Sequence, residues 1–221
     1  MRFPELLAGK AVTEFSEEKM NPWKLIATAV LFASSLSYAA EQPVYKVVQV
    51  AEVFEVRSYE PYVVAEVAVA GPAEEATEQA LSLLVGYIYG QNKTDKKIEL
   101  TTPVMQTSLL ASSTGAAAAT QSEDSAECLV RLMMPKSYLL SALPEPLDPR
   151  VKLRQLPSQR FAVIQYSGSW SRSNYDEHLE ILKLAMTQIG IVAHGEPVFA
   201  RYDSEFMPWF LRTNEIWLKV Q

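Results

Sequence analysis

The chain has 221 residues, of which 48% are hydrophobic and 21% are charged, and it carries a formal net charge of −6. That length and apolar fraction suit a globular domain of ordinary size with a substantial core. Nucleic acid is excluded as the expected partner, because binding phosphates requires clustered Lys and Arg rather than a mildly acidic surface. Cys128 is the single cysteine, so no intramolecular disulfide can form, and its apolar surroundings in the sequence predict a buried packing role.

Residues 20–39 have the pattern of a secretory signal peptide. Lys24 precedes an apolar run over residues 25–36, and Ser37-Tyr38-Ala39 follows the small-x-small rule for cleavage. The run is too short to span a membrane, and its serines disfavour the alternative of a single N-terminal anchor helix. We therefore expect cleavage near Ala39 and Ala40.

Residues 1–19 are polar and of mixed charge, which is unusual ahead of such a signal. We interpret Met20 as the true start of the protein and residues 1–19 as a non-native extension. The mature protein is then expected to be a single domain over residues 40–221, periplasmic or secreted, monomeric and without a stable membrane span. N-terminal sequencing of secreted material tests this interpretation, since residues ahead of Ala40 would contradict it.

The mature sequence contains two similar halves. Residues 54–71 read as two alternating strands that end at Gly71, and residues 151–168 repeat the pattern in register up to Gly168. A helix is predicted after each pair of strands, and two further strand-like stretches follow each helix. The order β-β-α-β-β thus occurs twice and gives about eight strands. It predicts an α+β domain whose antiparallel sheet closes into a barrel-like form.

Both predicted helices have start signals. The first is expected over residues 73–89, with Pro72 at its start and Gly90 just past its end. Its apolar face is formed by Ala73, Ala76, Ala80, Leu84 and Ile88, with Leu81 and Val85 beside them. The second is expected to be capped by Ser173, with Asp176 at the spacing of a capping box.

Two stretches between the elements are irregular. Residues 97–106, KIELTTPVMQ, begin as an alternating strand that Pro103 interrupts, because proline cannot donate a hydrogen bond to a central ladder. Residues 108–127 are rich in Ala, Ser and Thr and lack aromatic residues, which predicts a long flexible loop between adjacent strands.

No recognisable constellation for catalysis or metal binding is present in the sequence. His178 and His194 are the two histidines, and neither an HxxxH nor a CxxC spacing occurs. GSWS at residues 168–171 lacks the spacing of a nucleophile elbow. We therefore expect a protein that is not an enzyme and has no catalytic residues, and the sequence leaves any metal ligand unknown.

The stretch FMPWF at residues 206–210 gathers three aromatic residues and a methionine around a proline. Core packing is the ordinary explanation for most aromatic side chains. A loop of this composition can also line the mouth of an apolar ligand pocket.

KIELTTPVMQ, together with RYDSEFMPWFLRTNEIWLKV near the C-terminal end, resembles the SOUL haem-binding protein family. The family pattern is a KI-x-M-T-x-PV strand and a YD-x-x-x-x-P-x-x-R-x-NE-W closing hairpin. The strand VRSYEPYVVAEV and the GSW turn also fit, so the likeness extends from about Val44 to Val220. It implies a distorted antiparallel β-barrel of two pseudo-symmetric β-β-α-β-β halves with two flanking helices.

The resemblance further implies non-catalytic binding of haem or a related tetrapyrrole in a hydrophobic cleft beside the first helix. The residues that would border this cleft are Leu81, Leu84, Val85, Ile88, Met105, Phe206, Met207 and Trp209.

This chain departs from the family at charged positions. The first helix has no histidine, and Glu78 and Gly86 stand where basic residues are proposed to meet the haem propionates in other members. The cations that could substitute are Lys93, Lys96, Lys97 and Arg212, with Arg57 further off. Iron coordination would have to come from Tyr87, Tyr89, Met105 or His178.

Two alternatives remain open at this point, besides an enzyme that acts on tetrapyrroles, for example in iron removal, which no catalytic constellation supports. One is the binding of another flat hydrophobic small molecule, because the doubled β-β-α-β-β order also resembles the effector-binding domains of multidrug-responsive regulators. The other is a protein-interaction module that uses residues 206–210. A competition assay with neutral aromatic ligands separates the first from tetrapyrrole binding, and a pull-down abolished by Trp209→Ala identifies the second.

Overall fold

The computed structural model describes residues 40–71, 73–109 and 127–221. These residues form, in chain order, β1 (Tyr45–Val50), β2 (Glu55–Tyr59), β3 (Tyr62–Ala70), α2 (Ala73–Ile88), β4 (Val104–Leu109), β5 (Glu127–Met133), β6 (Lys152–Leu156), β7 (Gln159–Tyr166), α3 (Arg172–Gln188), β8 (His194–Arg201) and β9 (Asn214–Val220), with the short 3-10 helices η2 (Leu140–Ala142) and η3 (Trp209–Leu211). After β1, the order β-β-α-β-β occurs twice, which confirms the predicted repeat.

Three of the predicted segments lie wholly or mostly outside the described residues. These are the extension over residues 1–19, the signal peptide over residues 20–39 and most of the loop over residues 108–127. β4 continues to Leu109 and β5 begins at Glu127, so the described ends of that loop belong to strands. None of the helices that the structure describes is long and apolar enough to cross a membrane.

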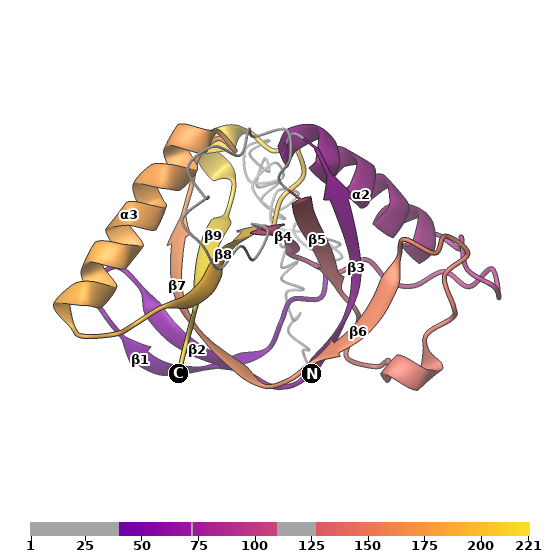
Figure 1. The fold of residues 1–221 in the computed structure, drawn as a ribbon, viewed down its shortest axis with the longest axis horizontal. Helices are drawn as coiled ribbons and strands as arrows, with labels where there is room; N and C mark the ends of the chain where they lie inside the picture. Colours follow the sequence, from indigo (N-terminus) through magenta and orange to yellow (C-terminus); the bar gives the residue numbers. More distant parts are fainter. Residues whose placement is uncertain (1–39, 72, 110–126) are drawn as a thin grey trace, which may run out of the picture. The chain divides into compact units, whose positions relative to one another are not determined.

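The described strands form one antiparallel sheet in the order β1-β2-β7-β9-β8-β4-β5-β3-β6, and the sheet curls into a half-barrel (Figure 1). The two halves of the sequence exchange strands within it. β2 pairs with β7, and β3 pairs with β6, so the first strand of each half lies beside the second strand of the other. The β4–β8 pair joins the halves a third time.

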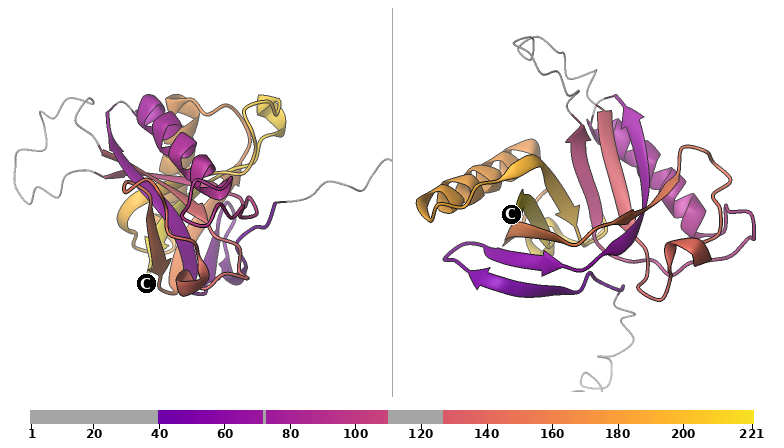
Figure 2. Two further views of the ribbon diagram at one scale, coloured as in Figure 1. Left: turned by 90° about the vertical axis from the view of Figure 1, so that its right-hand side faces the viewer. Right: turned by 60° about the horizontal axis from the view of Figure 1, so that its bottom comes forward.

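Each helix covers the outer side of one half of the sheet (Figures 1 and 2). α2 packs on β3 and β5, and Leu84 and Ile88 are buried there with Val130 and Leu132. α3 packs on β7 and β9 and buries a second apolar cluster that includes Leu182, Met186, Ile216 and Leu218. The alternation of each strand therefore supplies one apolar row to a helix.

The inner side of the curled sheet carries a second apolar row. Its buried members are Tyr59, Val64, Met105, Met133, Phe161, Val163, Ala200 and Trp217. Tyr59 stacks on Trp217 with ring centroids 5.0 Å apart, and Phe161 lies 5.5 Å from Trp217. Aromatic rings thus form the floor of the inner side, opposite to the side that the helices cover.

The start of α3 differs from the prediction. Ser171, rather than Ser173, is the N-cap, and its Oγ accepts the N–H of Asn174 at 3.3 Å. The Asn174 side chain in turn donates to the carbonyls of Ser167 and Ser169, at 3.4 and 2.9 Å. Asn174, in the first turn of α3, therefore fixes the chain segment that precedes the helix. The helix begins two residues earlier than the capping-box spacing indicates.

Residues 97–100 are not a strand, although they alternate in the sequence. Ile98 is buried and donates its N–H to the carbonyl of Ile88 at 2.9 Å, whereas Leu100 is exposed. Thr101 forms a single bridge with Glu41, and the Thr102–Pro103 peptide is cis. Regular pairing begins only at Val104, after the proline that has no N–H to donate.

Candidate functional site

The residues predicted on the first helix divide into two environments. Leu84 and Ile88 are completely buried in the core between α2 and the sheet. Leu81 and Val85 are partly exposed on the same helix. Met105 lies on β4 and points to the inner side of the sheet, among the apolar residues that face Trp217. The structure thus places these five residues on different sides of the sheet.

Phe206, Met207 and Trp209 lie together on the connection between β8 and β9. Phe206 is 88% exposed and Trp209 is 62% exposed, and Met207 is also exposed. Phe210 and Leu211, which belong to η3, are more than half exposed as well. We call residues 206–211 the apolar loop. The stretch FMPWF covers residues 206–210 of this loop and leaves out Leu211, because no pattern in the sequence tells an exposed leucine from a buried one.

Arg212 holds the apolar loop in place. Its Nε donates to the carbonyl of Met207 at 2.8 Å, and its Nη2 donates to the carbonyl of Glu205 at 2.6 Å. The N–H of Gly168 donates to the carbonyl of Trp209 at 3.1 Å, which ties the loop to the turn before α3. A chain segment with this many fixed carbonyls presents its side chains in a defined arrangement.

Two guanidinium groups lie over the Trp170 ring beside this loop. The Arg212 guanidinium carbon is 4.2 Å from the centre of the Trp170 ring, and that of Arg201 is 4.9 Å from it. The indole N–H donates to Asn214 Oδ1 at 2.9 Å, and Asn214 Nδ2 donates to the carbonyl of Gly168 at 3.1 Å. These two hydrogen bonds therefore join the GSW turn to the start of β9.

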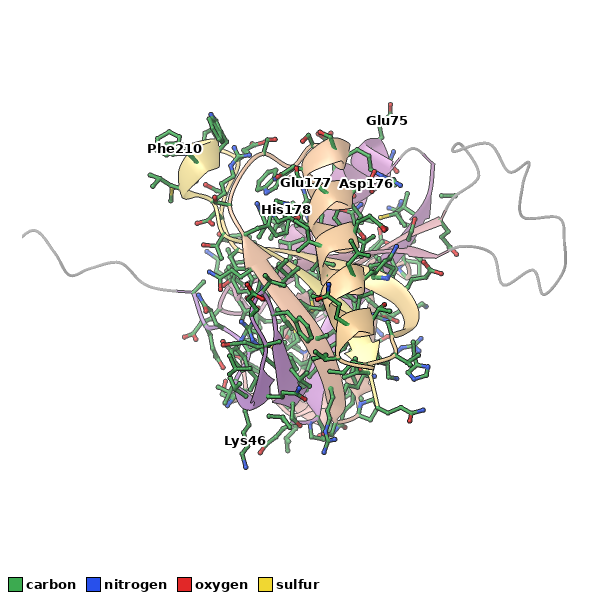
Figure 3. The ribbon with its side chains drawn as sticks, turned by 90° about the vertical axis from the view of Figure 1, so that its left-hand side faces the viewer. Lys46, Glu75, Asp176, Glu177, His178 and Phe210 are labelled. Atoms are coloured by element: carbon green, nitrogen blue, oxygen red, sulfur yellow. The ribbon has the colours of Figure 1, made fainter. Side chains whose placement is uncertain are left out.

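His178 lies on α3, on the side from which the loop with Phe210 projects (Figure 3). Its ring stacks on Tyr166 with centroids 4.0 Å apart and an interplanar angle of 14°. Its Nδ1 is 2.8 Å from the carbonyl of Asn174, which can only accept a hydrogen bond, so Nδ1 carries the proton. In the neutral ring, Nε2 then presents a lone pair.

A cavity of about 200 Å3 opens on the inner side of the sheet. Its lining comes from seven of the strands and consists of Tyr62, Met105, Thr107, Arg131, Leu156, Gln159, Phe161, His194, Gly195, Glu196, Val198, Trp217 and Lys219. Met105, Phe161 and Trp217 are buried at its floor, whereas His194 and Lys219 are exposed at its mouth. None of the motifs in the sequence indicated this cavity. A possible signal was the near-continuous apolar character of β7 and β9, which is typical of strands buried on both faces.

Glu215 is buried on the inner side of the sheet, and both of its carboxylate oxygens accept hydrogen bonds. Its Oε1 accepts from Arg57 Nη1 at 2.8 Å, and its Oε2 accepts from the Tyr202 hydroxyl and the Trp217 indole N–H, both at 2.7 Å. Burial alone would lower the pKa of Arg57, but the Glu215 carboxylate overrides it and leaves the pKa raised. Burial, and then Glu215, raise the pKa of Tyr202.

Glu66, on β3, forms a second buried charge cluster on the inner side. Its Oε2 pairs with Arg131 Nε and its Oε1 pairs with Arg154 Nε, both at 2.8 Å. One carboxylate thus serves two guanidinium groups, and the cluster carries a net charge of +1. Arg131 lines the cavity, whereas Arg154 does not.

Most of the cations proposed to meet propionates are already engaged. Lys93 pairs with Glu145 at 2.7 Å beside an open depression of about 720 Å3 at the C-terminal end of α2. Lys96 lies 4.7 Å from the centre of the Tyr138 ring. Arg57 is buried with Glu215, and Arg212 holds the apolar loop.

The described residues contain no group of three or more His, Cys, Asp or Glu side chains that could hold a metal ion by themselves.

Comparisons with known proteins identify a family and similar folds. Residues 40–219 match the family model described as SOUL haem-binding protein. Comparison with curated proteins found no significant match. The C-terminal domain of EcmrR is 8% identical, with a TM-score of 0.54 over 80% of this chain and 98% of that one.

Two structures from Listeria innocua have a similar fold. An uncharacterised conserved protein is 12% identical, with a TM-score of 0.56 over 83% of this chain and 94% of that one. A protein described as a hydrolase is 11% identical, with a TM-score of 0.53 over 88% of this chain and 98% of that one. At these identities the likeness concerns the fold alone.

Proposed function

This chain belongs to the SOUL haem-binding protein family, and we propose that it binds haem or a related tetrapyrrole without catalysing a reaction on it. The observation that carries the proposal is the apolar loop, in which five of six consecutive residues expose apolar side chains. Monomeric soluble proteins rarely leave such a patch uncovered unless it receives a ligand or a partner. A tetrapyrrole offers a flat apolar face, whose burial stabilises a complex by roughly 25 cal/mol per Å2 of apolar surface.

The first helix contributes to this proposal in part. Leu81 and Val85 keep some exposed surface, so either side chain could contact a bound ring. Leu84 and Ile88 are buried beneath them and would support the site from within the core. Met105 faces the inner side of the sheet, and we leave it out of the proposed tetrapyrrole site.

His178 fits the requirements of an iron ligand. Metal-binding histidines almost always donate their second ring N–H to a carbonyl or carboxylate, which fixes the tautomer. His178 does so to Asn174, whose amide also holds the turn that bonds to Trp209. A bound haem would supply the iron and the redox-active ring, and His178 would supply one nitrogen ligand. The propionates would remain in solvent, since Arg212 is engaged by carbonyls.

Parallel titrations of the full chain with haemin and with iron-free protoporphyrin test the proposal. We expect both pigments to saturate near one equivalent, because both present the same apolar face. Phe206→Ser combined with Trp209→Ser should weaken both affinities at least tenfold, or about 1.4 kcal/mol. The matched control is Leu139→Ser combined with Leu147→Ser, which removes two exposed apolar side chains elsewhere and should change neither affinity.

Absence of saturable binding by either pigment would overturn the proposal. The apolar loop would then be better explained by a partner protein or by another flat hydrophobic molecule. Equal weakening by the loop variant and by its control would show that the pigment adheres to exposed apolar surface in general, and would overturn the assignment to this loop.

A further inference from the structure

We propose that the cavity on the inner side of the sheet is a second binding site, for a small aromatic carboxylate. This site is separate from the tetrapyrrole site, because its residues lie on strands β3 to β9 and none of them belongs to the apolar loop or to α3. The proposal does not depend on the proposed function.

The size of the cavity limits its ligand to a small molecule. Its volume of about 200 Å3 is well below the 300–1,000 Å3 that drug-sized ligands occupy. At about 30 Å3 for each water in the liquid, the cavity has room for roughly seven waters, or for one aromatic ring with a short substituent. A tetrapyrrole is too large to enter it.

The floor of the cavity is suited to a flat apolar ring. Phe161 and Trp217 are buried there, and their rings are 5.5 Å apart at an interplanar angle of 48°. Met105 adds a polarizable thioether, which packs favourably against aromatic rings. A ligand ring in contact with such side chains is stabilised beyond the effect of simple burial.

The wall of the cavity provides an anion-binding group. The Arg131 side chain is 23% exposed, and its Nε donates to Glu66. Its two terminal nitrogens have no hydrogen-bond partner among the residues that the structure describes, and those nitrogens are the pair that binds a carboxylate in a bidentate manner. Because Glu66 is shared with Arg154, the cluster retains a charge of +1 that an anionic ligand would neutralise.

Charge on the other walls agrees with an anion rather than a cation. Lys219 and His194 lie at the mouth, and Glu196 is the acidic residue that lines the cavity. Glu215 is not available to a cationic ligand, because its oxygens already accept from Arg57, Tyr202 and Trp217.

The mouth of the cavity has irregular backbone. The pairing of β8 with β9 shifts register between His194 and Val198, and Gly195 has a φ of +75°. Bulges of this kind redirect side chains and are frequent beside binding sites.

Three probes of almost equal size test the proposal: benzoate, benzamide and benzamidine. We expect the full chain to bind benzoate, benzamide at least tenfold more weakly, and benzamidine more weakly still, because the guanidinium attracts an anion and repels a cation. Binding is followed by NMR on protein with carbon-13 in its methionine methyl groups. Benzoate should shift the signal of Met105, which lines the cavity, and leave that of Met207, which lies on the apolar loop. Met105→Leu and Met207→Leu assign the two signals.

Arg131→Gln and Arg154→Gln form a matched pair of variants. Each removes one of the two partners of Glu66 and keeps the other, but only Arg131 lines the cavity. Arg131→Gln should weaken benzoate binding at least tenfold and leave benzamide binding unchanged. Arg154→Gln lowers the cluster charge by the same amount but leaves the Arg131 contact in place, so it should weaken benzoate binding no more than about threefold. Thermal unfolding of both variants confirms that each is folded.

The proposal is overturned if benzoate does not shift the Met105 signal at millimolar concentration, or if benzamidine binds as well as benzoate. Equal losses in the two Arg variants would also overturn it, because a general change in charge rather than a contact would then explain the binding. Haemin titrations of Arg131→Gln separate the two sites, since we expect pigment binding to be unaffected there. A negative result for one of the two sites would not overturn the proposal for the other.

Discussion

Arg57 and Glu215 form a 2.8 Å ion pair between two strands that are not neighbours in the sheet, since β7 lies between β2 and β9. Their side chains are only 5% and 4% exposed. A buried pair of this kind need not stabilise a fold relative to apolar residues, but removing one partner leaves an uncompensated buried charge.

Arg57→Met is expected to lower the free energy of unfolding by about 3–5 kcal/mol, because it leaves the Glu215 carboxylate buried without its cation. Urea unfolding followed by circular dichroism measures the change. Arg57→Met combined with Glu215→Gln should be more stable than Arg57→Met alone, since the buried charge is then gone as well. A double variant that is less stable than the single one would contradict this account.

Tyr87→Phe tests a buried hydroxyl in the last turn of α2. The Tyr87 hydroxyl donates to the carbonyl of Pro144 at 2.9 Å, and its loss should lower the free energy of unfolding by about 1 kcal/mol at neutral pH. Burial, with a smaller effect of Tyr138, raises the pKa of Tyr87 to about 12 from its ordinary value of 10.

The same variant should alter the dependence of stability on alkaline pH. Between pH 10 and 12 the unfolded chain loses the Tyr87 proton and the folded protein keeps it, so stability falls as the pH rises through this window. The fall should be shallower in Tyr87→Phe, although other buried tyrosines still contribute. Unfolding curves at pH 8, 10 and 11 measure the slope, and identical slopes in both proteins would contradict the prediction.

Gly168→Ala and Gly71→Ala compare the two halves of the repeat at equivalent positions. Both glycines have a positive φ, +121° and +132°, so alanine is strained at either one. A Cβ on Gly168 would also lie 2.6 Å from Nδ2 of Asn174, whereas one on Gly71 would meet nothing within 4 Å. Gly71→Ala should therefore lower the free energy of unfolding by about 1 kcal/mol and Gly168→Ala by about twice as much. Differential scanning calorimetry measures both, and a larger loss at Gly71 would contradict the comparison.

Arg212→Gln should loosen the apolar loop without unfolding the domain. The substitution removes the two hydrogen bonds to the carbonyls of Met207 and Glu205, and it removes the cation stacked on Trp170. Hydrogen exchange of amides over residues 204–211 should become at least tenfold faster, while exchange in β7 and β9 stays slow. Arg212→Lys is the control for charge, and it should resemble Gln because an ammonium cannot reproduce the planar fork.

His178→Gln tests the inferred iron ligand. The Soret band of the haemin complex should shift towards that of free haemin, whereas binding of iron-free protoporphyrin should be unchanged, because only iron requires the nitrogen. His194→Gln is the matched control at the mouth of the inner cavity and should alter neither spectrum. An unchanged Soret band in His178→Gln would remove this residue from the proposal and leave the apolar loop in it.

Much of the fold could be predicted because local patterns specify it. The two glycines of the repeat, the helical spacing of Leu84 and Ile88, and the alternation of the strands each reflect neighbours close in sequence. β1 was not predicted. Its residues Tyr45–Val50 are exposed, so no buried face imposes an alternation on them. The exchange of strands between the halves depends on long-range pairing, which leaves no local trace.

The sites were predictable to a smaller degree, for two different reasons. FMPWF was recognised by its composition, but the exposure of Phe206 depends on how Arg212 fixes the loop carbonyls. The inner cavity was missed because its lining residues are scattered over seven strands and meet only when the sheet curls. Arg131 carries no signal of its own in the sequence, because Glu66 and Arg154, which form its charge cluster, lie on other strands.

The exchange of strands between the halves also bears on how such a chain could have arisen. A polypeptide that contained a single β-β-α-β-β unit would hold its first two strands without their pairing partners, since β2 pairs with β7 and β3 with β6. Two identical copies could satisfy each other by reciprocal pairing across a two-fold axis. Gene duplication and fusion of such a swapped homodimer would give this topology directly, and the two copies would then be free to diverge in sequence.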